Sequence, residues 1–457
     1  MAWNVVIAGG GFGGFYAART LERVLPSHSA RVSIVNDVNF MLYTPLLPGA
    51  AAGTLEPRHV VIPLREQLHH TDLRLGTVLD ADLDGGHVRV KTLEGHEEEL
   101  KYDQLIVTLG AVSRALPVPG LAEHALGFKT LPDAIALRNG LLQCLEAAET
   151  LEDAAERESW LTFIFVGAGY AGLEGLAELQ DFAADVIELY PRCRTQGMRW
   201  ILVEARDRVM PEITADLAEF ASRELRGRGI EIRTRWTLQR LTATDATLAP
   251  VGADGAHGGE VIPCRMLVWT AGVRPHPATS HLGLPLDPNG RIVVDRTMRV
   301  QGRPNVWAIG DAAAVPDPAA KYERPCPPTC QHAIRQGRLV ARNVAAELGT
   351  GRVRPFRYKT KGVFVDMGQQ QAVATTLGIK WRGRLAWWLA RTYHLAMVPG
   401  FKRRARLLVD WNVQLLFGRD SSELGRLGHP GRLVDTTSGG LPAEVPASDG
   451  AARAAAR

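Results

Sequence analysis

Two glycine-rich turns, far apart in the chain, have the spacing that binds a diphosphate group. The first follows the apolar stretch 3–8, the second follows the apolar stretch 162–166, and each precedes an expected helix. In this context backbone N–H groups and the positive end of the helix dipole point at the ligand. The diagnostic glycines are Gly9, Gly11 and Gly14 in the first turn and Gly167, Gly169 and Gly172 in the second. One such turn is common, whereas the pair indicates two dinucleotides bound at once, usually for electron transfer between them.

A dinucleotide site also needs an acceptor for the ribose hydroxyls at the end of the second strand of each unit. In the second unit this residue is Glu204, whose carboxylate would repel a 2′-phosphate and so favours NADH over NADPH. The nearby Arg206 and Arg208 could soften that preference. In the first unit the matching position is Asn36, followed by Asp37, which is a weaker form of the pattern. The alternative for Glu204 is a solvated strand end.

The elements that position these residues alternate between strand and helix. A helix through about residue 24 follows the first turn, and further buried strands are expected at 31–35, 102–110, 200–204, 266–272 and 306–311. The pattern predicts an α/β fold with two Rossmann-like dinucleotide-binding domains. The strand at 306–311 is expected to return the chain to the first domain.

Length and composition set limits on the class of protein. At 457 residues the chain is too long for one core, and a net charge of +4 gives no case for nucleic acid. Five scattered cysteines argue against a secreted disulfide scaffold. The first strand begins at residue 3, which leaves no room for a signal peptide, and no apolar run of about 18 residues predicts a transmembrane helix. We expect a reducing, cytoplasmic setting.

Three features together resemble a known family of flavoproteins. They are the paired glycine turns, the Thr-x-Gly ends of the strands at 102–110 and 266–272, and the stretch 308–313, Ala-Ile-Gly-Asp-Ala-Ala. More narrowly, the stretch 327–337 is similar to the helix start at the quinone site of type II NADH:quinone oxidoreductases. The resemblance runs from about residue 4 to about residue 427. It implies a chain that holds FAD, oxidises NADH and reduces a membrane quinone without pumping protons.

The resemblance also implies a role for each matching residue. Gly9, Gly11 and Gly14 would bind the FAD diphosphate, with Asn36 at the ribose position and Asp311 on the ribityl chain. Gly167, Gly169, Gly172 and Glu204 would bind NADH. Glu174 would lie near the nicotinamide–flavin contact, although a helix-start carboxylate stabilised by the dipole is an equal alternative. Gln331 would lie beside the quinone. These assignments make Glu174 and Gln331 the predicted catalytic residues.

The surroundings of Gln331 match the family in part. Thr329 can cap the helix that begins there, and the two preceding prolines, 327 and 328, fix its approach. Two departures stand close by, because Cys330 replaces the usual alanine and Arg335 replaces a usual second glutamine. The second glutamine contact to the quinone is therefore in question.

Cys326 and Cys330 could form a redox pair beside the flavin, as in sulfide:quinone oxidoreductases, or a chance pair in a loop. No cysteine occurs in 40–48, where disulfide reductases carry their thiol pair. No metal site is expected, since further ligands at zinc spacing are missing. The open alternatives are a soluble reductase with a protein, thiol or sulfide acceptor, and a flavin-bound NADH sensor.

The C-terminal region mixes tryptophans with basic residues. Leu385, Trp388, Leu389, Thr392 and Ala396 recur at helical spacing, and a second helix is expected at about 402–417. Basic stems with aromatic residues suit an interfacial helix, each cation adding about 1 kcal/mol near an anionic surface. We therefore expect peripheral binding at the cytoplasmic face of the membrane. The alternative is an amphipathic helix packed on the flavin domain or in a homodimer.

These interpretations divide the chain into five parts. Residues 1–118 and 275–350 are expected to form the FAD-binding domain, 119–274 the NADH-binding domain, 351–430 a C-terminal region on the membrane and quinone side, and 431–457 a disordered tail.

Overall fold

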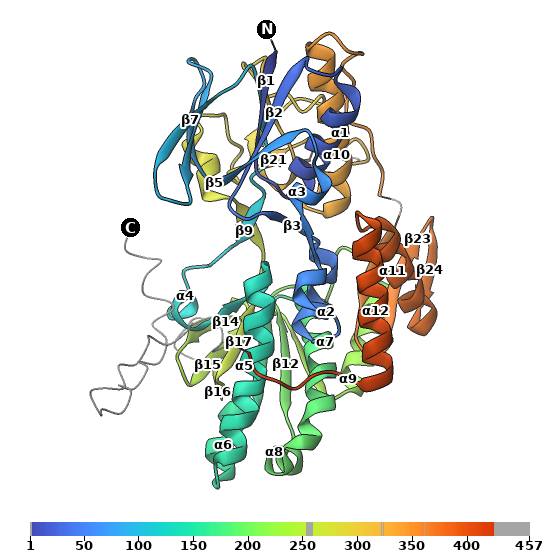
Figure 1. Cartoon of the computed structure of the whole chain (residues 1–457). Helices are drawn as coiled ribbons and strands as arrows, with labels where there is room; N and C mark the ends of the chain where they lie inside the picture. The colour runs from blue at the N-terminus through green and yellow to red at the C-terminus, as the bar shows by residue number, and fades with distance from the viewer. Residues whose placement is uncertain (1, 253–258, 321, 323, 361, 425–457) are drawn as a thin grey trace, which may run out of the picture.

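The computed structural model describes residues 2–252, 259–320, 322, 324–360 and 362–424. One sheet organises the upper half of the molecule in Figure 1 and another organises the lower half. A smaller C-terminal unit of strands and helices lies beside the lower half (Figure 1). The predicted tail, 431–457, lies outside the described residues.

The first domain is built on a seven-stranded sheet with the order β20-β8-β1-β2-β5-β6-β7. The strands from β20 to β5 pair in parallel, whereas β6 and β7 add an antiparallel edge. The bounds are β1 (Trp3–Ala8), β2 (Ala30–Asn36), β5 (Thr71–Asp82), β6 (His87–Thr92), β7 (Glu97–Lys101), β8 (Gln104–Val107) and β20 (Val306–Ala308). Because β20 pairs with β8, the chain returns to this sheet after forming the second domain, as predicted from the stretch 306–311.

Two helices of this domain that are distant in sequence pack closely against each other. Helix α1 (Phe12–Val24) packs against α10 (Cys330–Glu347), and the two lie side by side in Figure 1. Their backbones approach so closely that a Cβ atom on Gly337 would lie 2.3 Å from the carbonyl oxygen of Gly13. This contact brings the predicted quinone-side residues of α10 next to the first glycine turn.

The second domain contains a five-stranded parallel sheet with the order β10-β17-β11-β12-β13. Its strands are β10 (Leu126–Gly127), β11 (Thr162–Val166), β12 (Arg199–Glu204), β13 (Ile230–Thr234) and β17 (Met266–Trp269). The covering helices are α5 (Leu131–Thr150), α6 (Ala154–Trp160), α7 (Tyr170–Val186), η3 (Ile187–Leu189), α8 (Pro191–Gln196) and α9 (Ala215–Gly227). An antiparallel sheet adds β14 (Trp236–Leu241), β15 (Asp245–Pro250) and β16 (Glu260–Pro263).

The segments that leave β8 and β17 pair with each other as β9 (Ala111–Ser113) and β18 (Val273–Pro275). They carry the chain from the first domain to the second and back. The remaining short elements are β3 (Phe40–Leu42), η1 (Thr44–Leu46), α2 (Leu47–Ala51), η2 (Pro57–His59), β4 (Val61–Pro63), α3 (Leu64–Gln67), α4 (Leu121–His124), η4 (Pro277–His281), β19 (Ile292–Val293), η5 (Gly310–Ala312) and β21 (Ala313–Ala314).

The C-terminal unit contains β22 (Gly362–Asp366), β23 (Ala372–Thr376) and β24 (Ile379–Arg382), followed by α11 (Gly383–Met397) and α12 (Phe401–Phe417). Helix α11 packs on this antiparallel sheet and contacts α12. The buried core within the unit is small and consists of Ala372, Ala374 and Ala386. The unit must therefore be held largely by its contacts with the two domains.

The fold class predicted from the sequence is confirmed. The central strands are buried, near-continuous apolar runs, as parallel sheets covered on both faces require. The expected strands at 3–8 and 162–166 have the same bounds in the structure, and the expected helix at 402–417 begins one residue earlier. Among the described residues, no helix combines the length and the apolarity needed to cross a membrane.

The close approach of α1 and α10 can be tested by adding one methyl group. Gly337→Ala should destabilise the protein by about 1–3 kcal/mol, because the new Cβ atom would overlap the Gly13 carbonyl. The matched control is Gly140→Ala within α5, where the nearest atom lies 3.7 Å away. That change should stabilise the helix by about 0.5–1 kcal/mol. Thermal or urea unfolding measures both, and equal effects would contradict this packing.

Candidate functional site: two dinucleotide cradles and the strand between them

The first glycine turn forms an open cradle at the end of β1. Gly9 has φ +108°, a conformation that other residues rarely adopt, and a Cβ atom on Gly14 would lie 1.9 Å from the Gly9 carbonyl oxygen. Nothing lies within 4 Å of the Cβ position of Gly11, which is the N-cap of α1 and provides no side-chain cap. The helix N-terminus therefore faces open space, as a diphosphate requires.

The second glycine turn repeats this geometry at the end of β11. Gly167 has φ +105°, and a Cβ atom on Gly172 would lie 1.9 Å from its carbonyl oxygen. The Cβ position of Gly169, the N-cap of α7, again has open space around it. All six glycines predicted at diagnostic positions therefore lie in two matching cradles.

The two predicted ribose residues occupy equivalent positions. Asn36 Oδ1 accepts a hydrogen bond from the N–H of Gly10 at 2.8 Å. Glu204 Oε2 accepts one from the N–H of Ala168 at 2.8 Å, and its Oε1 accepts from the N–H of Arg206 at 2.9 Å. Each side chain thus braces its own glycine turn from the end of the neighbouring strand. Glu204 is a positioned carboxylate rather than a free strand end.

The guanidinium of Arg208 is hydrogen-bonded within the protein. It donates to the carbonyls of Pro211 and Ile213, at 2.8 and 3.0 Å. The other nearby cation, Arg206, lies 3.8 Å from a carboxylate oxygen of Glu212. Main-chain carbonyls thus bind the Arg208 guanidinium, and the expected effect of Arg206 and Arg208 on the NADH preference stays a prediction.

Asp311 lies in η5, between the end of β20 and the start of α10. It lines an open cavity of about 240 Å³ together with Arg114, Arg274 and Arg291. Burial raises the pKa of Asp311, while Lys129, with its Nζ 3.8 Å from Oδ2, opposes the shift. The cavity is polar and cationic, which suits a phosphorylated cofactor.

Glu174 and Gln331, the predicted catalytic residues, are hydrogen-bonded to opposite ends of one strand. Glu174 Oε1 accepts from the N–H of Asp366 at 3.0 Å, and Gln331 Nε2 donates to the carbonyl of Gly362 at 3.0 Å. Gly362 and Asp366 are the first and last residues of β22. Four steps along a strand span about 13 Å. The strand therefore contacts side chains from both domains, one at each of its ends.

The structure contradicts the alternative interpretation of Glu174. The first turn of α7 contains no acidic residue, and Glu174 bonds to β22 instead of its own helix. Burial raises its pKa well above the usual range, and the Asp366 N–H opposes that shift. Glu174 also lines a small cavity of about 40 Å³ between η1, α2, α7, β22, α11 and α12.

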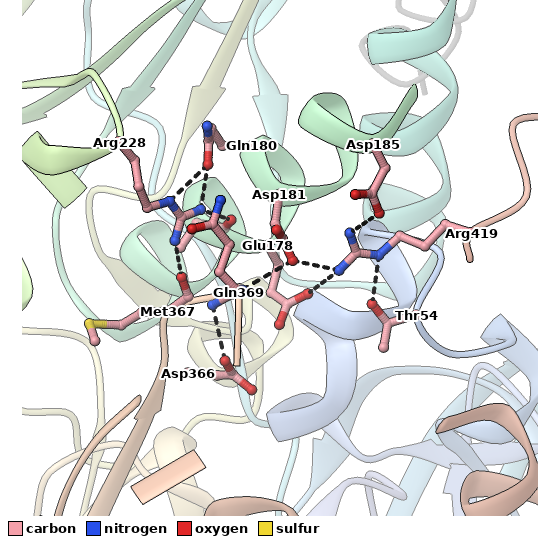
Figure 2. Close-up of polar contacts among 12 residues, drawn as sticks. Thr54, Glu178, Gln180, Asp181, Asp185, Arg228, Asp366, Met367, Gln369 and Arg419 are labelled. Atoms are coloured by element: carbon pink, nitrogen blue, oxygen red, sulfur yellow. Dashed lines mark hydrogen bonds and ion pairs between the residues drawn. The ribbon is translucent and has the colours of Figure 1, made fainter. Parts of the chain in front are cut away.

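Arg419, beyond the end of α12, is inserted among three carboxylates of α7. Its guanidinium lies 2.7 Å from Asp181 and 2.7 Å from Asp185, and 3.9 Å from Glu178. It also donates to Thr54 Oγ1 at 3.2 Å. Figure 2 shows these contacts on one side of α7. The side chain is 5% exposed, so the segment after α12 is fixed to the second domain.

Arg228 makes a second attachment on the other side of α7 (Figure 2). It donates to Gln180 Oε1 at 2.9 Å, to the Ala177 carbonyl at 2.8 Å and to the Met367 carbonyl next to β22. The C-terminal unit is thus fixed to α7 by guanidinium groups on both sides of the helix.

The cavity beside Glu174 is lined by further titratable groups. Burial raises the pKa of Glu178 to about 8 and also raises that of Asp366, while Arg391 lowers the pKa of both. Glu178 Oε2 has no hydrogen-bond partner. Burial lowers the pKa of His394 to about 4, so this histidine is neutral, and its Nδ1 lies 3.5 Å from the Tyr43 hydroxyl.

The cysteine pair does not have the character of a thiol relay. Burial raises the pKa of Cys326 to about 12 and that of Cys330 to about 11, which disfavours the reactive thiolate. Cys326 Sγ contacts the Pro316 carbonyl at 3.8 Å, and both thiols are free. Within the described ranges, no group of three or more potential metal ligands occurs.

Several residues of the site were not predicted from the sequence. They are Tyr358, which donates to Gln331, and the cavity residues Glu178, Asp366, Arg391 and His394. Glu178 follows Glu174 by one helical turn, a spacing that could have identified it. Nothing in the local sequence marks His394 as a residue that faces Tyr43.

Comparisons with known proteins agree with this architecture. A family model described as pyridine nucleotide-disulphide oxidoreductase matches residues 3–337. The type II NADH:quinone oxidoreductase Ndh of Mycobacterium tuberculosis is 32% identical over 91% of this chain and 89% of its own. The demethylphylloquinone reductase NdbB of Synechocystis is 30% identical over 89% and 95%. The NDH2 of Plasmodium falciparum, solved with NADH, has a TM-score of 0.85 at 19% identity and covers 92% of this chain and all of that one, which shows a shared fold.

The fold and the two cradles define a flavoprotein oxidoreductase that binds two dinucleotides. These two relatives match over most of their own length. The chain belongs to the pyridine nucleotide-disulphide oxidoreductase family and, within it, to the type II NADH:quinone oxidoreductases.

The raised pKa of Glu178 makes a prediction about stability. Between the ordinary value of 4.5 and the folded value of about 8, the folded state holds a proton that the unfolded state releases. The free energy of unfolding should therefore fall as pH rises through this window, by at most about 1.4 kcal/mol per pH unit. Glu178→Gln should remove that component and flatten the curve.

Thermal unfolding from about pH 5 to about pH 8 measures the effect. Glu219→Gln, at an exposed position of α9, is the matched control and should follow the wild type. If the Glu178→Gln curve runs parallel to the wild-type curve, Glu178 does not titrate in this window.

Proposed function

We propose that this chain oxidises NADH and passes two electrons through a resident FAD to a quinone, without pumping protons. The observation that carries the proposal is the joint contact of Glu174 and Gln331 with β22. Glu174 follows the second cradle and Gln331 begins the helix beside the first. One strand therefore aligns the donor side with the acceptor side.

The first cradle and the cavity at Asp311 fit FAD. We assign the diphosphate to the turn of Gly9, Gly11 and Gly14, because the open helix N-terminus above Gly11 supplies N–H donors. Asp311 would hydrogen-bond the ribityl hydroxyls, and Asn36 keeps the turn in shape through Gly10. When bound, FAD supplies the ability to accept a hydride from NADH and to return two electrons to a quinone.

The second cradle fits NADH as a visiting substrate. We assign its diphosphate to Gly167, Gly169 and Gly172 and its adenosine ribose to Glu204. Both oxygens of Glu204 already accept backbone N–H groups, which fix the carboxylate and leave lone pairs for the ribose hydroxyls. A 2′-phosphate would meet this negative charge, so NADPH should bind less well.

On the acceptor side the chain supplies orientation and charge. Helix α10 begins at Cys330 with Thr329 as its N-cap, and its dipole presents positive charge where negative charge develops. Gln331 in its first turn would donate a hydrogen bond to a quinone carbonyl. Glu174 would hold a proton beside the cavity, because its raised pKa keeps the neutral form populated.

The C-terminal helices suit a membrane surface on the cytoplasmic side, where NADH is available. The predicted stripe of α11 is exposed, with Leu385 at 56% and Trp388 at 64%, and the ends of α12 expose Phe401 and Phe417. Exposed Arg384, Lys402 and Arg406 accompany this apolar face. Exposed apolar side chains together with exposed cations match an anionic lipid surface.

Other aromatic and basic residues of the C-terminal region make contacts within the protein. Trp411 is 7% exposed and lies under Arg391, and Tyr393 stacks on Phe364. Lys380 pairs with Asp216 of α9, as does Arg382. The membrane proposal therefore rests on the exposed residues of α11 and α12.

The function is tested by anaerobic spectroscopy of the purified holoprotein. NADH should bleach the flavin absorbance, NADPH should do so more slowly, and a soluble quinone analogue should restore the absorbance. Bleaching without recovery on quinone addition would rule out the acceptor while leaving the NADH half intact. Recovery with sulfide-derived or protein acceptors alone would favour the alternative reductase.

Membrane binding is tested with vesicles that contain anionic phospholipid. The double variant Leu385→Ser, Trp388→Ser should lose most of its co-sedimentation, and added salt should weaken the wild type. Leu93→Ser, at a 71% exposed position of the first domain, is the control and should sediment normally. If the double variant binds vesicles normally but changes from dimer to monomer, the stripe is a homodimer interface instead.

A further inference from the structure

The amide of Gln331 is held by the segment that leads from α10 into β22. Tyr358 donates its hydroxyl hydrogen to Gln331 Oε1 at 2.7 Å, and Gln331 Nε2 donates to the Gly362 carbonyl at 3.0 Å. Both polar ends of the side chain therefore have a partner within the protein.

These contacts fix which way round the amide lies. A backbone carbonyl can only accept, so the group facing Gly362 must be the NH2 group. The oxygen must then face Tyr358, whose hydroxyl is able to donate. Because the NH2 group has two hydrogens and Gly362 takes one, Gln331 keeps one free donor. A rotating glutamine could instead present its oxygen.

Tyr358 is itself held in place. The guanidinium of Arg335 lies over its ring, 4.1 Å from the centroid, and donates to the main-chain carbonyl of Gln331 at 2.9 Å. The edge of His332 contacts the same ring, with centroids 5.0 Å apart. The side chain of Thr329 fixes His332 through a 2.8 Å contact to Nδ1. The first two turns of α10 thus support the residue that orients Gln331.

We propose that Tyr358, supported by Arg335, is a positioning residue that locks Gln331 as a hydrogen-bond donor, so that the acceptor site prefers quinone over quinol. A quinone carbonyl only accepts hydrogen bonds and matches the free N–H. A quinol hydroxyl must place its own hydrogen elsewhere, and the locked amide offers it no oxygen. The oxidised substrate is favoured for binding and the reduced product for release.

This inference rests on the proposed function of Gln331 and gives Arg335 a role. Arg335 stands where the family resemblance expects a second glutamine. A second amide could present either a donor or an acceptor to the ligand. In this chain the position instead braces Tyr358, so recognition of the quinone would depend on one oriented amide.

The test is a Tyr358→Phe variant of the holoprotein, which keeps the ring for Arg335 and removes only the hydroxyl. With a soluble quinone analogue, KM should rise about five-fold, a factor that corresponds to the net ~1 kcal/mol of one hydrogen bond. Inhibition by the matching quinol should become stronger relative to substrate binding. The rate of flavin bleaching by NADH should not change.

Two further variants complete the test. Tyr190→Phe removes a comparable hydroxyl, which donates to Glu146 at 2.8 Å in the second domain, and should change none of these values. Arg335→Met removes the cation from the Tyr358 ring and should shift the same two constants in the same direction, by less. Equal melting temperatures and flavin contents confirm that each variant is folded.

The outcomes separate this inference from the proposed function. If Gln331→Leu raises the quinone KM but Tyr358→Phe changes neither KM nor quinol inhibition, the locking role is overturned and the role of Gln331 stands. If Gln331→Leu changes neither, both roles are overturned. If wild-type protein fails to reduce quinone at all, the proposed function itself is wrong.

Discussion

The rest of the structure depends on one steric constraint that occurs twice. In each domain the helix after the glycine turn lies so close to the preceding strand that a third-glycine Cβ atom would meet a carbonyl oxygen at 1.9 Å. Only glycine allows this approach at Gly14 and Gly172. The approach places an uncapped helix N-terminus at the end of a parallel strand, where N–H groups face open space. Both cofactor sites and the equivalent positions of Asn36 and Glu204 follow from it.

The two cradles could not cooperate without a third element to align them. Strand β22 takes this role because it is hydrogen-bonded to both domains. Its Gly362 carbonyl accepts from Gln331 of the first domain, and its Asp366 N–H donates to Glu174 of the second. Its own unit has a small core, but Val363, Val365 and Met367 pack into the apolar core of the second domain. Guanidinium groups on both sides of α7 add polar attachments. Apolar packing holds the strand against the second domain, and the directional polar contacts define its position there.

The sequence predicted the features that depend on local spacing. A strand, a glycine turn and a following acidic residue lie within one βαβ unit, so Gly167 and Glu204 were recognisable without knowledge of the fold. The helix start at Thr329 was equally local. By contrast, Tyr358 meets Gln331, and His394 meets Tyr43, only after distant segments pack together. In the C-terminal helices the spacing of the residues predicted the stripe of α11. Tertiary contacts, such as that of Trp411 with Arg391, decide which tryptophans face inward.

The buried carboxylates between α7 and β22 oppose folding, since desolvation disfavours their charged forms. Apolar residues would fill such an interface at lower cost. Three acidic side chains around Arg419 nevertheless specify one position for the segment after α12. If this segment moved, the buried Arg419 cation would lose its partners. The cavity beside Glu174 is lined by residues of η1, α2, α7, β22, α11 and α12, and the Arg419 ion pairs fix the segment after α12 against one of these elements, α7. Glu178 belongs to both groups, since it is one of the desolvated acids of the interface and also one of the three acidic neighbours of Arg419.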